Sequence, residues 1–170
     1  MNTFKDATTE EINAIMEQSW NAFETYRTFS LQQRAGFMHA IATALGSISE
    51  AVVAAAMKET HLPEPRLNNE LTRTIFQLNS YADACEQGNW IEARIDTAIT
   101  ERNPPKPDLR KMLVPLGPVV VFGASNFPFA YSTAGGDTAC ALAAGCPVIV
   151  KAHPAHAQTS QMVSDTIIKV

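Results

Sequence analysis

The amino-acid sequence predicts an α/β fold with a helical first half, and three observations support it. Apolar residues recur at helical spacing through that first half. A stretch in which apolar and charged residues alternate follows, with the period of a β-strand. Two apolar runs, Val119–Phe122 and Pro147–Val150, then flank a segment with helical spacing. We therefore expect a helical part over 1–90, a hairpin arm over 91–114, and the first strand–helix–strand–helix unit of a Rossmann-like, doubly wound parallel sheet over 115–170.

The helical part opens with signals for helix capping. Thr8–Glu11 and Ser30–Gln33 each place a hydroxyl side chain three residues before a carboxylate or an amide, which predicts a capping box. Gly46 is expected to end the second helix, and Ser47–Glu50 to begin a third. The first helix carries an apolar stripe for which we expect core packing: Ile12, Ile15, Met16, Trp20, Phe23 and Tyr26.

A fourth helix is expected after Pro63 and Pro65, which break the chain. Its apolar residues recur from Leu67 to Cys85 and predict a face that packs on the core. Gly88 supplies the C-terminal stop.

The arm is predicted from a change of period. Residues 91–99 alternate between apolar and charged side chains, which predicts a half-buried strand. The proline-rich stretch Pro104–Asp108 turns the chain, and Arg110–Val114 can run back beside the first strand. Because an exposed strand edge needs a cover, we expect this arm to pair with a neighbouring subunit.

The last part has the pattern of a parallel sheet. Val119–Phe122 is a continuous apolar run, as expected for a strand that is buried on both faces. A helix is expected from Pro128 to Ala144, followed by a second strand over Pro147–Val150. The chain turns at His153–Ala157 into a last helix, which we expect to continue to residue 170.

Composition narrows the classes of function. The 170-residue chain is 46% apolar, has a net charge of −4 and contains no basic run, so we expect no nucleic-acid partner. It contains no apolar run of about 18 residues, so we expect no membrane partner. The acidic N-terminus has no apolar signal core, and we expect a cytoplasmic protein.

Asn126 and a glycine pair stand out in the stretch that follows the first parallel strand. Asn126 falls at the strand's carboxyl end, where open α/β sheets bind ligands, and its amide could stabilise an oxyanion. An asparagine can equally cap a helix, and spacing alone leaves both roles open. Gly135 and Gly136 would each cost about 0.5–1 kcal/mol inside a helix, which points to a close backbone neighbour or to a kink.

The segment PLGPVVVFGASNFPFAYSTAGGDTACALAAGCPVIVKAHPAHAQTS resembles the aldehyde dehydrogenase family. The upstream stretches ETHLPEPRLNNELTRTIFQL, GNWIEARIDTAI and PDLRKMLVPLGP resemble the NADP-preferring branch that oxidises 2-oxoglutarate semialdehyde, or 2,5-dioxopentanoate. A branch that oxidises long-chain fatty aldehydes is similar over the same segment. A non-enzymatic association module built from the helical half and the arm is the alternative from another class.

The resemblance implies a mechanism and a set of site residues. In the family a cysteine thiolate attacks the aldehyde, hydride passes to the nicotinamide, and a glutamate activates the water that hydrolyses the thioester. Asn126, in the motif Asn-Phe-Pro, is then the oxyanion donor. The strand end Phe122, Gly123, Ala124 and Ser125 lines the cofactor cleft, and Lys151 holds the adenosine ribose.

The resemblance also bears on the choice of cofactor. NAD-preferring relatives place a glutamate three residues after the lysine, and this carboxylate would repel a 2′-phosphate. This chain has Pro154 at that position, with His153 beside it. Lys151 can pair with the phosphate, so we expect NADP to be preferred, with NAD possible.

Two parts of the family's catalytic machinery have no counterpart in the chain: the nucleophilic cysteine and the glutamate base. Cys140 and Cys146 are not expected to be the nucleophile, because neither has a basic neighbour that would lower its pKa. We expect an N-terminal fragment that is inactive by itself, from a parent enzyme that is a homodimer or homotetramer. No metal site is expected, since His153 and His156 have no acidic or sulfur partner nearby.

Overall fold

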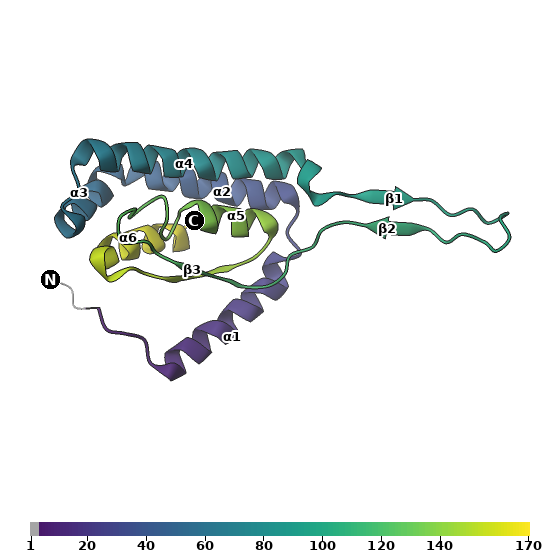
Figure 1. The fold of residues 1–170 in the computed structure, drawn as a ribbon, viewed down its shortest axis with the longest axis horizontal. Helices are drawn as coiled ribbons and strands as arrows, with labels where there is room; N and C mark the ends of the chain where they lie inside the picture. Colours follow the sequence, from purple (N-terminus) through teal and green to yellow (C-terminus); the bar gives the residue numbers. More distant parts are fainter. Residues whose placement is uncertain (1–3) are drawn as a thin grey trace.

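The computed structural model describes residues 4–170 and contains six α-helices, two 3₁₀ helices and four strands in this part of the chain (Figure 1). In chain order, the elements are α1 Thr9–Tyr26, α2 Leu31–Ser47, α3 Ser49–Thr60, α4 Glu64–Gln87, η1 Asn89–Ile91, β1 Arg94–Asp96, β2 Leu109–Lys111, β3 Val119–Phe122, α5 Gly136–Ala144, β4 Val148–Lys151, η2 Pro154–His156 and α6 Ala157–Ile168.

The core lies between α2 and α4, which run side by side, and it continues to α5 and α6 (Figure 1). Spacings of three and four residues put Met38, Ile41 and Leu45 on one face of α2, where all three are fully buried. Leu67 and Leu78 meet them from α4 and are also fully buried. The apolar stripe predicted for the fourth helix is therefore confirmed as a core face.

Local capping signals were predicted correctly in two helices. In α1, Thr8 accepts from the Glu11 amide while the Glu11 carboxylate accepts from the Thr8 amide. Ser30 and Gln33 form the same box in α2. The predicted stop at Gly46 was wrong. The helix α2 continues past Gly46 to Ser47, and Gly46 is not in the left-handed region.

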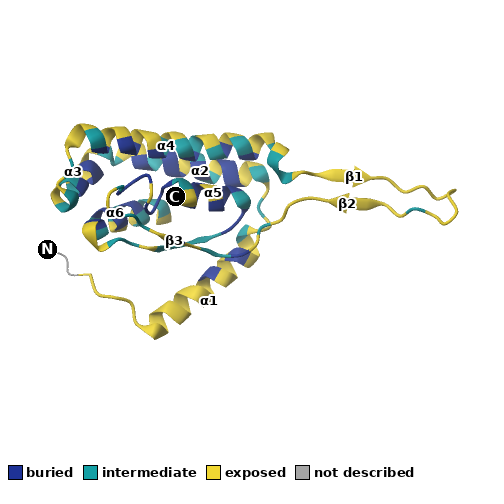
Figure 2. Ribbon diagram, in the orientation of Figure 1, coloured by how far each residue is buried: buried dark blue, intermediate teal, exposed yellow. Residues whose placement is uncertain are grey.

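The predicted apolar stripe of α1 is buried only at its C-terminal end, and its first four residues are exposed, contrary to our expectation. Trp20 is 53% exposed, and Ile12, Ile15 and Met16 are exposed as well. Only the C-terminal end of the helix is fixed, where Phe23 is buried and the Tyr26 hydroxyl donates to the Leu142 carbonyl oxygen at 3.0 Å. Figure 2 shows most of the rest of α1 exposed.

The arm is a long two-stranded ribbon that projects from the helical body (Figure 1). Its antiparallel pairing was predicted correctly, with Ile95 opposite Arg110. The strand is shorter than predicted, since residues 89–91 form a 3₁₀ helix, and every residue of β1 and β2 is exposed rather than half-buried. Because the ribbon packs against no other element of the described chain, neither of its faces is buried.

The parallel pair β3–β4 confirms the predicted sheet. Val119 pairs with Val148, and the register continues to Phe122 opposite Lys151. Burial on both faces was not found: Val121 is buried, whereas Phe122 is 72% exposed. The helix α5 contacts both strands, and α1 contacts β4. Part of the surface of β3 is left without a cover in the described residues.

The helix after β3 begins eight residues later than predicted, at Gly136 rather than Pro128. The glycine pair therefore lies at the helix start and not in its interior, and Gly135 is the N-cap. A Cβ at Gly135 would lie 2.3 Å from the carbonyl oxygen of Ala130, so of the two alternatives left open by the sequence, the close backbone neighbour is the one found. At Gly136 a Cβ would meet only the Gln77 side chain at an ordinary distance of 3.5 Å. The last helix, α6, ends at Ile168 and does not reach residue 170.

Within residues 4–170, no single helix is both long and apolar enough to cross a bilayer. The bent pair α2 and α3, which meet at 71°, passes the same test of length and composition.

Candidate functional site

The carboxyl ends of β3 and β4 lie at one edge of the sheet and bring the predicted site residues together. Phe122 and Lys151 are register partners, and the Gly123 amide donates to the Lys151 carbonyl oxygen at 3.0 Å. A Cβ at Gly123 would lie 3.1 Å from the backbone nitrogen of His153. The absence of a side chain at Gly123 thus lets the two strand ends approach closely.

A turn follows β3 and carries Asn126. The Ala124 amide donates to the Tyr131 carbonyl oxygen at 2.8 Å, which closes the turn. Ser125 and Asn126 are exposed, and within residues 4–170 the side-chain amide of Asn126 makes no hydrogen bond. Helix capping is excluded for Asn126, because Gly135 caps α5. Its amide is therefore free to donate to a ligand.

Two side chains of α4 hold this turn, and neither was predicted from the sequence. Arg66 donates from Nη2 to the Asn126 carbonyl oxygen at 2.7 Å and stacks its guanidinium over the Phe127 ring at 5.2 Å. The buried Glu70 carboxylate accepts from the amides of Phe129 and Ala130 at 2.8 and 2.9 Å. Glu70 gave a detectable signal, since it is an acidic residue on the buried face of its helix.

The end of β4 is built differently. Lys151 is exposed, and no carboxylate in the described chain lies within ion-pair distance of its ammonium. His153 caps η2, where its Nδ1 accepts from the Ala155 amide at 3.1 Å, so its proton lies on Nε2. Pro154 is exposed in the first turn of η2. This edge therefore presents one free cation and one imidazole N–H donor.

The cysteines lie away from this edge. Cys146 precedes β4 and so belongs to the opposite, amino-terminal edge of the sheet, and Cys140 is in the middle of α5. Burial raises the pKa of the Cys85 thiol, which donates to the Ala143 carbonyl oxygen at 3.4 Å. A raised pKa disfavours the nucleophilic thiolate. None of the three is placed to attack a ligand at the carboxyl edge.

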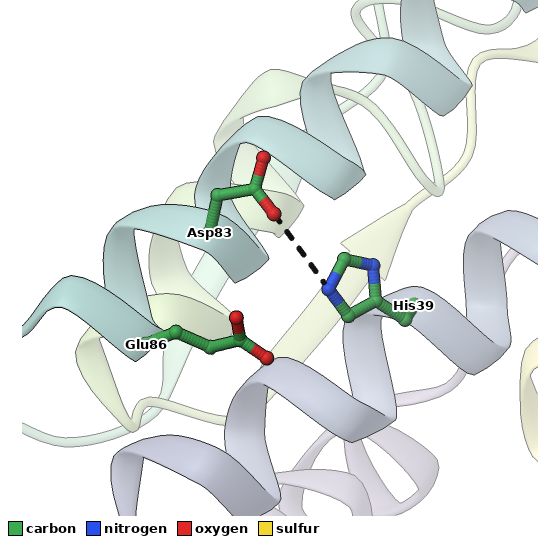
Figure 3. Close-up of side chains that lie close together, drawn as sticks. All are labelled: His39, Asp83 and Glu86. Atoms are coloured by element: carbon green, nitrogen blue, oxygen red, sulfur yellow. Dashed lines mark ion pairs between the residues drawn. The ribbon is translucent and has the colours of Figure 1, made fainter.

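One group of side chains in the described residues has the spacing of metal ligands, and it lies on α2 and α4 (Figure 3). It consists of His39, Asp83 and Glu86, whose ligand atoms lie within 4.8 Å of one another. Nε2 of His39 is 3.8 Å from the Asp83 carboxylate, and Nδ1 lies 2.7 Å from the Asn79 side-chain oxygen. Both carboxylates are exposed to solvent, so the group needs no metal ion to keep their charges apart from the protein interior.

The chain is similar to known proteins of one family. The model of the aldehyde dehydrogenase family matches residues 1–170. The chain is 48% identical over 165 residues to alpha-ketoglutaric semialdehyde dehydrogenase 2 of Azospirillum brasilense, covering 96% of this chain and 31% of the relative. It is 44% identical over 167 residues to alpha-ketoglutaric semialdehyde dehydrogenase of Acinetobacter baylyi, covering 98% and 32%.

Among solved structures, 1-pyrroline-5-carboxylate dehydrogenase from Thermus with bound NAD has a TM-score of 0.83 at 22% identity, over 96% of this chain and 30% of that one. This likeness supports the fold. The chain spans about a third of the length of the curated relatives it matches. Because the family model covers the whole sequence, the chain belongs to the aldehyde dehydrogenase family.

Proposed function

We propose that this chain forms the N-terminal part of an NADP-linked aldehyde dehydrogenase that oxidises 2-oxoglutarate semialdehyde to the carboxylate. One observation carries the proposal: the free amide of Asn126 and the free ammonium of Lys151 belong to adjacent strand ends of one sheet. The semialdehyde is supported by the identity to two alpha-ketoglutaric semialdehyde dehydrogenases.

Asn126 is the proposed oxyanion donor. When a thiolate adds to an aldehyde, the carbonyl oxygen gains negative charge, and a neutral amide N–H can stabilise it without adding a full charge of its own. Two features support this role. The Asn126 side chain is exposed at the turn, and its own carbonyl oxygen is fixed by Arg66 at 2.7 Å. The cysteine and the glutamate base must come from residues other than those at this edge.

The residues at the sheet edge fit a nicotinamide dinucleotide. Phe122 and Ser125 are exposed at the carboxyl end of β3, where open α/β sheets bind ligands, so a ligand can reach this strand end. Lys151 offers three N–H donors to a ribose or a phosphate. Members of the family use NAD or NADP, which would supply the hydride acceptor when bound at this edge.

We propose NADP as the preferred cofactor, with NAD also used. A 2′-phosphate carries nearly two negative charges and forms strong, charge-assisted hydrogen bonds with a cation. Lys151 supplies that cation, and no carboxylate of the described chain pairs with it. Pro154 provides no carboxylate that would repel the phosphate. His153, the residue before Pro154, carries an Nε2–H that is a further donor.

We further propose that the complete enzyme is a cytoplasmic homodimer or homotetramer in which the arm pairs with a neighbouring subunit. The arm exposes Ile95, Leu109 and Met112, and its outer strand edges have no partner in the described chain. Such a ribbon needs a cover to avoid non-specific association.

The test is an assay of the complete product of the gene that encodes this segment. Purified protein is incubated with 2-oxoglutarate semialdehyde or a long-chain fatty aldehyde, each with NADP or NAD, and the rate at which reduced cofactor forms is measured by absorbance. The proposal predicts the highest kcat/KM for the semialdehyde with NADP. A higher kcat/KM for the fatty aldehyde would mean that the semialdehyde is not the substrate. No turnover with any aldehyde and cofactor would favour the alternative, a non-enzymatic association module.

The same assay on the isolated 170-residue chain provides a control. We expect no turnover above a blank, because none of its cysteines lies at the carboxyl edge of the sheet. Turnover by this chain, at a verified mass, would contradict the assignment of the nucleophile to another part of the enzyme.

A further inference from the structure

His156 is fully buried, at the last position of η2, and neither of its ring nitrogens faces solvent. Nε2 lies 2.7 Å from the carbonyl oxygen of Ala124, in the turn that carries Asn126. Nδ1 lies 3.2 Å from the Ser160 hydroxyl, one turn further along α6. A buried imidazole with two assigned partners, one of them in the active-site turn, is not explained by helix packing alone.

The chemistry of the partners fixes the direction of these hydrogen bonds. A carbonyl oxygen only accepts, so Nε2 carries the proton and donates to Ala124. In the neutral ring, Nδ1 then accepts from the Ser160 hydroxyl. The Ser160 oxygen lies 3.2 Å from the Ser132 hydroxyl and can accept from it in turn. The chain of donors therefore runs from Ser132 to the Ala124 carbonyl.

These bonds close a ring around the turn. Ala124 is tied to Tyr131 through its amide and to His156 through its carbonyl oxygen. Ser132, the residue after Tyr131, is tied back to His156 through Ser160. The turn from 124 to 131 is thus held at both of its ends by one buried network, and Asn126 lies on the segment between them.

We infer that His156 is a positioning residue for the Asn126 amide, acting through the Ala124 carbonyl two residues before it. This inference rests on the proposed function, in which that amide stabilises the oxyanion. Stabilisation of developing charge requires donors whose position is fixed before reaction. A displacement of about 1 Å can lower the rate by about 100-fold. Loss of the Nε2 donor frees the carbonyl and so loosens the turn.

The test compares three variants of the complete enzyme. His156→Ala removes both bonds, and we expect kcat to fall by about 10–100-fold with the KM for the aldehyde within about threefold. His156→Gln places an amide N–H near the position of Nε2. If His156→Ala lowers kcat by about 100-fold, we expect kcat of His156→Gln to be at least about tenfold higher than that of His156→Ala. His61→Asn is the matched control, because His61 is an exposed helix cap in the left-handed region, which asparagine tolerates.

Hydrogen exchange measured by mass spectrometry reports the protection of the backbone amides in the turn and does not depend on enzyme activity. We expect the amides in 122–131 to exchange about tenfold faster in His156→Ala, the peptides of α2 to be unchanged, and His156→Gln to restore protection. If the wild type lacks dehydrogenase activity, the proposed function fails while this measurement still tests the network. Unchanged exchange in the turn, no rescue by glutamine, or a looser turn with unaltered kcat would each overturn the inference.

Discussion

The two strand ends that meet at the site are held very differently. The turn after β3 is fixed by side chains of α4 and η2: Arg66 and Glu70 of α4, and His156 at the end of η2. At the end of β4, Lys151 extends into solvent without a partner in the described residues. A donor that stabilises a short-lived charge must be positioned in advance, whereas a cation that binds a phosphate can make its contact on binding. The predictions below test this division of work in the complete enzyme.

Asn126→Ala should have the largest effect. We expect kcat to fall by about 10²–10³-fold, which is the usual loss when one oxyanion donor is removed. The dissociation constant of NADP should change little, because the amide is assigned to the aldehyde. Asn69→Ala, at an exposed position of α4, is the control. Loss of NADP binding with normal turnover of the bound complex would make Asn126 a cofactor-binding residue instead.

Glu70→Ala should reduce stability, because it leaves the buried amides of Phe129 and Ala130 without an acceptor. Each unpaired buried amide costs about 1–3 kcal/mol, so we expect the free energy of unfolding in urea to fall by about 2–4 kcal/mol. Glu70→Gln keeps an acceptor oxygen and should lose less than half of that. Equal losses in the two variants would mean that packing, not hydrogen bonding, explains the buried Glu70.

Lys151→Ala should weaken NADP more than NAD. The lysine can donate to the ribose of both cofactors, and only NADP adds a charged phosphate. We expect an extra loss for NADP of about 1–2 kcal/mol, or about 5–30-fold in kcat/KM. Lys58→Ala, which removes an exposed lysine from α3, should leave the ratio unchanged. A ratio within about twofold of wild type would assign discrimination to another part of the enzyme.

Pro154→Glu should shift the preference toward NAD by a smaller amount, about threefold to tenfold, or roughly 1 kcal/mol. The new carboxylate would repel the 2′-phosphate and could accept from the ribose hydroxyls of NAD. The variant keeps the position exposed in the first turn of η2, so folding should be unaffected. Measurement of kcat/KM with both cofactors decides the point, and an unchanged or higher preference for NADP would refute the role of residue 154.

The sequence predicted features whose causes are local. The boxes at Thr8 and Ser30, the left-handed stop at Gly88, and the parallel pair of apolar strands each depend on a few neighbouring residues. The start of α5 was not predictable in this way. Its turn is held by Glu70, which is 59 residues from Phe129 in the chain. Burial of the α1 stripe also depends on a partner surface rather than on spacing.

The site divides along the same line. The ends of two predicted strands located Phe122–Asn126 and Lys151 at one edge, and the structure brings them together there. Arg66 and His156 could not be assigned from spacing, since each acts on a residue at least 30 positions away in the chain. Long-range contacts of this kind leave no periodic signal in the sequence.

A double-mutant cycle tests most directly whether the two strand ends do separate work. The value of kcat/KM for NADP is measured in wild type, Asn126→Ala, Lys151→Ala and the double variant. Because the two side chains share no partner in the described structure, we predict that the two losses in free energy add within about 0.5 kcal/mol. A coupling of about 1.4 kcal/mol or more, which is a tenfold departure from additivity, would contradict the assignment of Asn126 to the aldehyde and Lys151 to the cofactor.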